Sequence, residues 1–142
     1  MEEHFLKKYV KGPQTFLSEP WYNSVGDCIS YKTADEAVVA DRIDEILTVY
    51  RSVVSDEPIG FKIKGVQVIL NKFGYDGLSV STEQNGTTVK SISIAVLLLA
   101  AYEEGPRSIK RRIGYANALL PHEGRLNIPM EQFCTANNYQ SA

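Results

Sequence analysis

The first half of the chain carries the two-residue alternation of hydrophobic and polar positions that is typical of β-strands. Residues 28–32 alternate, with Cys28, Ser30 and Lys32 on one side and Ile29 and Tyr31 on the other. The β-branched stretch 37–54 is too long for one strand, so it predicts two strands with a bend or bulge at Asp44-Glu45. Residues 59–63 return as a further strand after a strong turn signal. Residues 25–64 therefore predict an antiparallel β-meander.

The second half changes to the three-to-four-residue spacing of helices. The pattern predicts helices over about 65–73, 92–104 and 107–120. The middle helix is apolar on nearly all sides, which predicts a buried position at the centre of this half. Before it, Asn85-Gly86 predicts the turn of a β-hairpin. In the last helix four apolar residues share one face that we expect to be buried, namely Ile109, Ile113, Ala116 and Leu120.

Together these elements predict one α+β domain over residues 1–142, an antiparallel β-meander packed on one face by about three α-helices. The meander at 25–64 is followed by a helix-rich half at 65–134. We expect residues 1–24 to form a peripheral N-terminal arm and residues 135–142 to fray.

An aromatic pair, Trp21-Tyr22, stands in the predicted arm after Pro20. We expect both rings to anchor the arm to the core. The alternative is that the pair binds a ligand.

Composition adds limits on function. Of 142 residues, 44% are hydrophobic and 23% charged, which excludes wholesale disorder. The net charge is −2 and the pI about 5.7, so a nucleic-acid-binding protein of this composition would need a local basic patch.

Cys28 and Cys134 lie far apart and form no metal-binding pair, so we expect two free thiols, no metal and no cofactor. The first eight residues are charged where a signal peptide would be apolar. The longest apolar run, 92–102, is about half the ~20 residues that span a bilayer. These features predict a cytoplasmic protein that does not enter a membrane.

Carboxylates and a histidine are the candidate chemical groups. On a strand, Asp41 and Glu45 would project to one face, Arg42 and Asp44 to the other, and two acids on one face could act as an acid–base pair or bind a hard cation. The alternative is that charges in an apolar strand mark a sheet edge. His122 lies in a predicted surface loop, where a structural role is the main alternative to acid–base chemistry.

A basic group opens the last predicted helix. Arg107, Lys110 and Arg111 are predicted to lie on one exposed arc, and Arg112 flanks the apolar stripe. Such a cluster could contact phosphate or nucleic acid. Positive charge near a helix start is also unfavourable, which favours a functional reason for it, although a solvated face is the alternative.

Four short stretches carry a resemblance, namely residues 27–31, 42–44, 47–50 and 59–63. They resemble a small uncharacterised bacterial β-meander family of unknown function. The likeness is limited to about residues 27–70. It implies a bacterial, meander-based domain and implies no activity or site residues.

Three functions remain open. The absence of nucleotide-binding, hydrolase, metalloprotease and calcium-loop signatures favours a non-enzymatic interaction or regulatory module, which binds a protein partner or forms a homodimer through a sheet edge. The first alternative is a nucleic-acid-associated protein that uses the basic helix. The second is an enzyme or small-ligand binder that uses the strand carboxylates.

Overall fold

The computed structural model describes residues 18–133. The predicted frayed tail and most of the predicted arm lie outside these residues. One five-stranded antiparallel sheet contains, in spatial order, β1 (Trp21–Asn23), β2 (Cys28–Lys32), β5 (Pro58–Lys64), β4 (Leu47–Ser52) and β3 (Val38–Arg42). A second, three-stranded sheet contains β6 (Ser79–Gln84), β7 (Thr87–Ser93) and β8 (Asn127–Pro129). The helices are α2 (Val66–Phe73), α3 (Tyr75–Leu78), α4 (Ile94–Glu103) and α5 (Ile109–Leu119).

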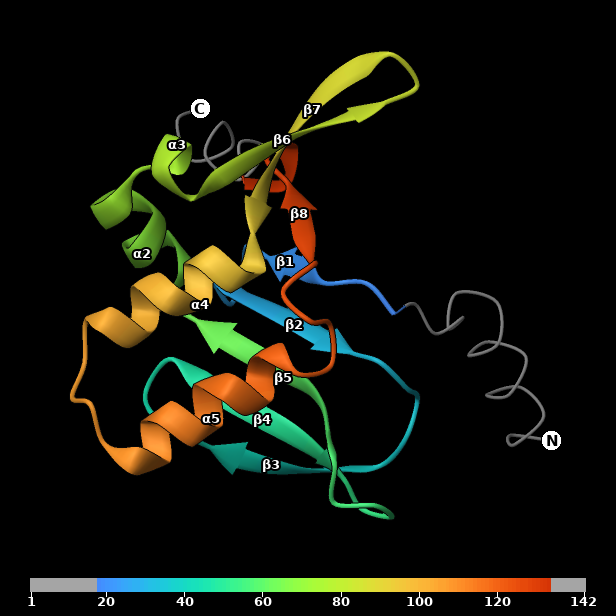
Figure 1. The fold of residues 1–142 in the computed structure, drawn as a ribbon, viewed down its shortest axis with the longest axis vertical. Helices are drawn as coiled ribbons and strands as arrows, with labels where there is room; N and C mark the ends of the chain where they lie inside the picture. The colour runs from blue at the N-terminus through green and yellow to red at the C-terminus, as the bar shows by residue number, and fades with distance from the viewer. Residues whose placement is uncertain (1–17, 134–142) are drawn as a thin grey trace, which may run out of the picture.

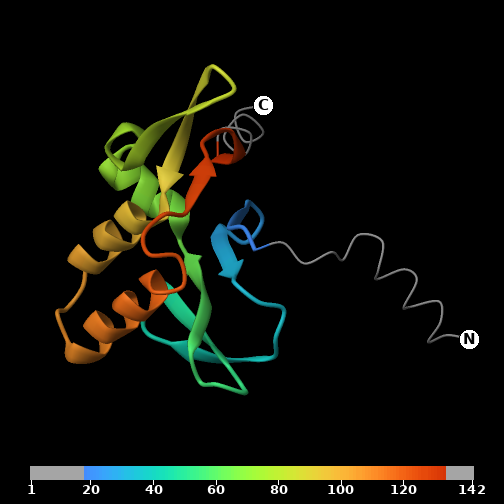
Figure 2. The same cartoon turned by 45° about the vertical axis from the view of Figure 1, so that its right-hand side comes forward.

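Helices α4 and α5 lie on one side of the five-stranded sheet, and in the described part of the chain no helix covers the other side (Figures 1 and 2). The predicted α+β class is confirmed, as is the antiparallel sheet with helices on one face. Strands β3, β4 and β5 are successive neighbours, as in a meander. Strand β2 instead pairs with β5, so the chain crosses to the far edge between β2 and β3.

The core forms where the apolar face of this sheet meets the helices. Register places Ile29 beside Ile63 and Tyr31 beside Phe61, with Val49 on the other side of Phe61. All five side chains are buried. This matched row of apolar side chains gives β2 and β5 a physical reason to pair, because a shift of one residue would turn every side chain to the opposite face.

The stretch 37–54 forms two strands, as predicted, but the strands fold back on each other. Asp44 and Glu45 lie in the tight connection between β3 and β4 rather than in a continuing strand. The side chain of Asp44 accepts hydrogen bonds from the amides of Ile46 (2.8 Å) and Leu47 (2.7 Å), which closes the turn. Strand β3 is an edge strand, as the charges of Asp41 and Arg42 indicate.

The hairpin of β6 and β7 has the turn that the sequence predicts. Asn85 and Gly86 connect β6 and β7 with φ angles of 53° and 78°. Two successive positive φ values are the geometry that Asn-Gly favours in a two-residue hairpin turn.

The aromatic pair of the arm divides between core and surface. Tyr22 is buried, its ring centroid lies 4.7 Å from that of Phe133, and its hydroxyl donates to Asp27 at 2.7 Å. Burial and the Asp27 carboxylate raise the pKa of Tyr22 to about 12, so the phenol stays neutral. Trp21 is 53% exposed, so the expectation that both rings anchor the arm is wrong for Trp21. Its alternation with Tyr22 along β1 turns it to the uncovered side of the sheet.

Candidate functional site: an exposed apolar surface on α4 and α5

Helix α5 lies with the face that was predicted to be buried turned toward solvent. Ile109, Ile113 and Leu120 are 75%, 53% and 63% exposed. The helix instead buries Arg111, Gly114, Tyr115 and Ala118. The prediction of the buried face is therefore wrong, and so is the prediction that Arg111 lies on an exposed arc.

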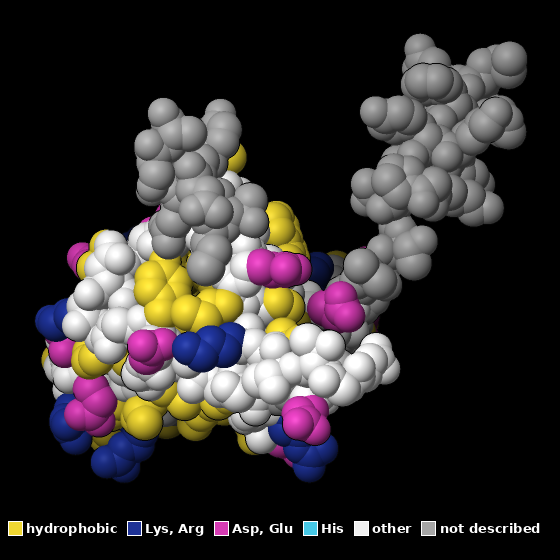
Figure 3. All heavy atoms as spheres, turned by 90° about the horizontal axis from the view of Figure 1, so that it is seen from above, with side chains coloured by type: hydrophobic (Ala, Val, Ile, Leu, Met, Phe, Trp, Pro, Cys, Tyr) yellow, Lys and Arg dark blue, Asp and Glu magenta, His cyan; other side chains and the backbone are white. Residues whose placement is uncertain are grey.

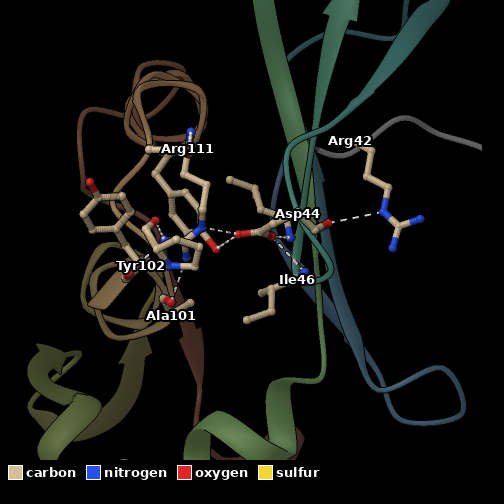
Figure 4. Close-up of polar contacts among 10 residues, drawn as sticks. Arg42, Asp44, Ile46, Ala101, Tyr102 and Arg111 are labelled. Carbon is tan, nitrogen blue, oxygen red and sulfur yellow. Dashed lines mark hydrogen bonds and ion pairs between the residues drawn. The ribbon is translucent and has the colours of Figure 1, made fainter. Parts of the chain in front are cut away.

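Arg111 explains this orientation. Its Nε donates to Oδ2 of Asp44 at 2.9 Å, and its terminal nitrogens donate to the carbonyls of Tyr102 (3.2 Å), Ala101 (3.3 Å) and Pro106 (Figure 4). Two of these carbonyls belong to the last turn of α4, where a positive charge is favourable. The guanidinium also stacks on the rings of Tyr102 and Tyr115, 5.0 and 5.2 Å from their centroids. Every donor group of Arg111 thus has a partner inside the fold.

Asp44 is the acidic partner in this cluster. Besides Arg111 and the two turn amides, Oδ2 accepts from the hydroxyl of Tyr115 at 2.8 Å. Burial opposes ionisation of Asp44, but hydrogen bonds from the Leu47 amide, Arg111, Tyr115 and the Ile46 amide outweigh it and lower the pKa of the carboxyl. Asp44 is therefore charged at neutral pH, and burial together with this charge raises the pKa of Tyr115.

Two glycines let α5 approach this closely. A Cβ atom on Gly114 would lie 2.5 Å from the side chain of Ile43 beside the β3–β4 turn. A Cβ atom on Gly105 would lie 2.6 Å from the guanidinium carbon of Arg111. Both positions therefore require the absence of a side chain for the Asp44–Arg111 contact to form.

A groove of about 210 Å³ runs between α4 and α5 beside the exposed stripe. It is lined by Ala95, Leu98, Leu99, Tyr102, Arg112, Tyr115, Ala116 and Leu119. Leu99 is itself 59% exposed. On a helical projection of α5, Ala116 belongs both to the groove and to the stripe, so the two are continuous. We call Leu99, Ile109, Ile113, Leu120 and this groove the α4–α5 apolar surface.

Charged side chains surround this surface. Arg107 pairs with Glu103 at 2.8 Å, and Lys110 is exposed. Arg112 is the single charged residue among those that line the groove. With Arg111 buried, the predicted basic cluster becomes a rim of three exposed cations, one of them paired.

The candidate carboxylates do not share one face. Asp41 pairs with Arg51 at 3.5 Å on the sheet, whereas Asp44 and Glu45 lie in the turn. An open hollow of about 400 Å³ is lined by Asp44, Glu45, Glu104 and Arg111, among others. Both carboxylate oxygens of Asp44 and all the guanidinium nitrogens of Arg111 already form hydrogen bonds within the fold. These groups are therefore not free to bind a ligand in the hollow.

His122 is buried rather than in a surface loop. Its ring packs against Phe61 and Tyr31, and Nδ1 accepts from the Gly124 amide at 3.1 Å. In the described residues Nε2 has no hydrogen-bond partner. Burial lowers the pKa of His122, outweighing the Ala118 carbonyl, which raises it. A neutral, packed imidazole fits the structural alternative better than acid–base chemistry.

Among residues 18–133, no three His, Cys, Asp or Glu side chains group as they would around a metal ion. No helix in this part of the chain has the length and apolar character needed to cross a bilayer. The thiol of Cys28 is free and buried, and Cys134 lies outside the described residues.

Comparison with protein-family models, curated proteins and solved structures gives no match to this chain. The bacterial β-meander resemblance therefore stays a prediction.

Proposed function

We propose that this protein is a non-enzymatic interaction module that docks through the α4–α5 apolar surface, and that this surface pairs with its counterpart on a second copy of the chain. The observation that carries the proposal is the exposure of Ile109, Ile113, Leu120 and Leu99 beside an apolar groove. Contiguous exposed apolar surface rimmed by polar groups is typical of protein-interaction sites.

The composition of the surface fits self-association. Its centre is apolar and its rim carries both signs of charge, from Glu103 and Arg107 at one end to Lys110 along α5. In a two-fold dimer the same patch of both copies is in contact, and an apolar stripe can pack against its own copy because it needs no partner of opposite charge. A second copy is also the one partner that is present wherever the chain is made.

The area that a stable dimer must bury follows from comparing the free energy of covering apolar side chains with the free-energy cost of association. Covering the exposed parts of Ile109, Ile113, Leu120 and Leu99 contributes roughly 1–2 kcal/mol for each side chain. Association costs about 4–15 kcal/mol, so the stripe alone is marginal and the groove must be filled as well. Dimerisation in the micromolar range is therefore the expected strength.

Sedimentation velocity over a wide concentration range tests the proposal. The wild type should change from monomer to dimer, and Ile113→Asp should weaken the dimer about tenfold or more because burying an unpaired carboxylate is unfavourable. Val54→Asp is the matched control, since Val54 is 90% exposed in the β4–β5 connection, which lies away from α5 (Figure 1). A wild type that stays monomeric, or a Val54→Asp effect as large as that of Ile113→Asp, contradicts the proposal.

The predicted sheet-edge dimer is distinguished in the same experiment. Strand β3 has an open edge, and Val39 on it is 56% exposed. If Val39→Asp dissociates the dimer and Ile113→Asp does not, the edge and not the α4–α5 apolar surface mediates self-association.

A further inference from the structure

One side of the five-stranded sheet faces away from α4 and α5 (Figure 2). Register aligns one outward-facing row across all five strands, made of Trp21, Ser30, Lys62, Thr48 and Arg42. The next row contains Lys32, Gly60, Tyr50 and Ala40. We call these two rows, with Lys64 at the end of β5, the open sheet face.

Its charge differs from that of the whole chain. The open sheet face carries four cations, Lys32, Lys62, Lys64 and Arg42, and no carboxylate, although the net charge of the chain is −2. Within residues 18–133, none of the four forms an ion pair. Arg42 donates from Nε to the Asp44 carbonyl at 3.3 Å and extends away from Arg111 (Figure 4).

This separation of charge is not general to the surface. On the end of the molecule seen in Figure 3, basic and acidic side chains are interspersed among hydrophobic ones. A polyanion that approaches the chain would therefore be attracted most strongly where cations lie without neighbouring acids.

Two aromatic side chains stand among these cations. Trp21 and Tyr50 both line an open hollow of about 400 Å³, together with Lys32, Ser30, Val38, Tyr31 and Glu19. Gly60 lies in register between Lys32 and Tyr50, and because it has no side chain it leaves the hollow between these two residues open. A Cβ atom there would lie 2.1 Å from the Tyr31 carbonyl oxygen, so the position requires glycine for packing as well. Glu19 is the one acid among the residues that line this hollow, and its carboxylate can accept hydrogen bonds from base amino groups.

We propose that the open sheet face binds single-stranded nucleic acid. Bases stack on Trp21 and Tyr50, and Lys32, Lys62 and Arg42 neutralise phosphates along the two rows. Aromatic platforms set among basic side chains bind single strands because every base offers a stacking face and every linkage a charge. A duplex is disfavoured, because its bases are already stacked on each other and cannot reach the two rings.

The inference is independent of self-association, because the open sheet face and the α4–α5 apolar surface lie on opposite sides of the sheet (Figures 1 and 2). It also differs from the basic-helix hypothesis, which uses Arg107, Lys110, Arg111 and Arg112. Either surface can fail without the other.

Titration of the full chain with fluorescein-labelled oligothymidylate and oligouridylate at low salt tests the proposal. Trp21 is the only tryptophan, so stacking should quench the intrinsic fluorescence in parallel with the rise in anisotropy. Three phosphate contacts predict that the affinity falls with salt with a log–log slope of about −2. The DNA and RNA arms show which single strand is preferred, and a duplex of the same length should bind more weakly.

Variants locate the binding. Lys32→Gln/Lys62→Gln should weaken binding and reduce the salt slope by about 0.7 for each lost phosphate contact. Trp21→Leu should cost about tenfold or more in affinity, whereas Trp21→Phe, which keeps a ring, should retain most of it. Lys110→Gln/Arg112→Gln removes the same charge from the opposite side and should leave binding unchanged.

Three outcomes would overturn the inference. One is no binding of either oligonucleotide at low salt. Another is a loss of binding in Lys110→Gln/Arg112→Gln that equals the loss in Lys32→Gln/Lys62→Gln. The third is competition by inorganic polyphosphate as effective as that by unlabelled oligonucleotide, because polyphosphate has charge and no bases. Circular dichroism of each variant separates loss of binding from loss of folding.

Discussion

Arg111 lies with its Nε 2.9 Å from Oδ2 of Asp44, a residue 67 positions earlier in the chain. The contact joins α5 to the β3–β4 turn, and Tyr115 donates to the same oxygen. A helix that buries its arginine and tyrosine on one side must turn its apolar stripe to the other. The orientation of the α4–α5 apolar surface is thus a consequence of this ion pair.

Replacing Asp44 by Asn should destabilise the fold strongly. The change removes the charge that compensates the buried guanidinium, and losing one partner of a buried pair costs about 3–5 kcal/mol. The depressed pKa of Asp44 also means that its stabilisation is present at neutral pH and is lost as the pH falls through the folded-state pKa, below about 4. Urea unfolding measures the free-energy change.

Asp41→Asn is the control for this variant. Asp41 pairs with Arg51 at 3.5 Å in a more exposed position, where an ion pair contributes about 0–1 kcal/mol. Equal losses in the two variants would mean that the Asp44–Arg111 pair is not buried as described.

The outward position of Ile113 has a consequence for stability. Ile113→Ser should change the unfolding free energy of the monomer by about 0.5 kcal/mol or less, as is typical of surface changes. Leu98 lies in the neighbouring helix α4 and is 1% exposed, so Leu98→Ala should lower the unfolding free energy by about 2–5 kcal/mol. Thermal unfolding of both variants at low protein concentration makes the comparison. A large loss in Ile113→Ser would place the stripe in the core, as the sequence pattern predicts.

The sequence predicts local elements well and the orientation of α5 badly. The strand at residues 28–32 and the Asn85-Gly86 turn are confirmed, because both depend on residues that are close together in the sequence. Periodicity marks Ile109 and Ile113 as one face of a helix but does not say which face is buried. That is decided by Asp44, whose contact with Arg111 leaves no short-range signal.

Two smaller differences from the sequence-based expectations, at Trp21 and His122, also depend on contacts between distant parts of the chain. Trp21 and Tyr22 are adjacent aromatic residues in the sequence, and only the pairing of β1 with β2 determines which ring meets Phe133. His122 follows a helix-ending proline that is typical of a surface loop, yet the loop packs against Phe61. The open sheet face depends on strand register, because its cations come from three separate strands.

His122 should make stability depend on pH. Its folded-state pKa is lowered, so the unfolded chain binds a proton first and folding weakens as the pH falls below the ordinary value of about 6.5. The slope is at most about 1.4 kcal/mol per pH unit for one proton. His122→Asn keeps an acceptor for the Gly124 amide and removes the titration. The unfolding free energy, measured with urea between neutral pH and about pH 5, should then change less with pH in the variant than in the wild type. An equal change in both proteins would show that His122 is not the group responsible.

Thiol labelling at position 113 tests the central claim, that α5 turns its apolar stripe outward and a second copy covers it. Ile113→Cys in a Cys134→Ser background carries one new thiol, and buried Cys28 serves as the slow internal reference. The account predicts that a maleimide labels position 113 much faster than Cys28 in dilute solution, and that labelling slows as the protein concentration rises through the dimerisation range. Labelling as slow as that of Cys28 in dilute solution would show the stripe packed inward, and fast labelling at every concentration would show that no second copy covers it.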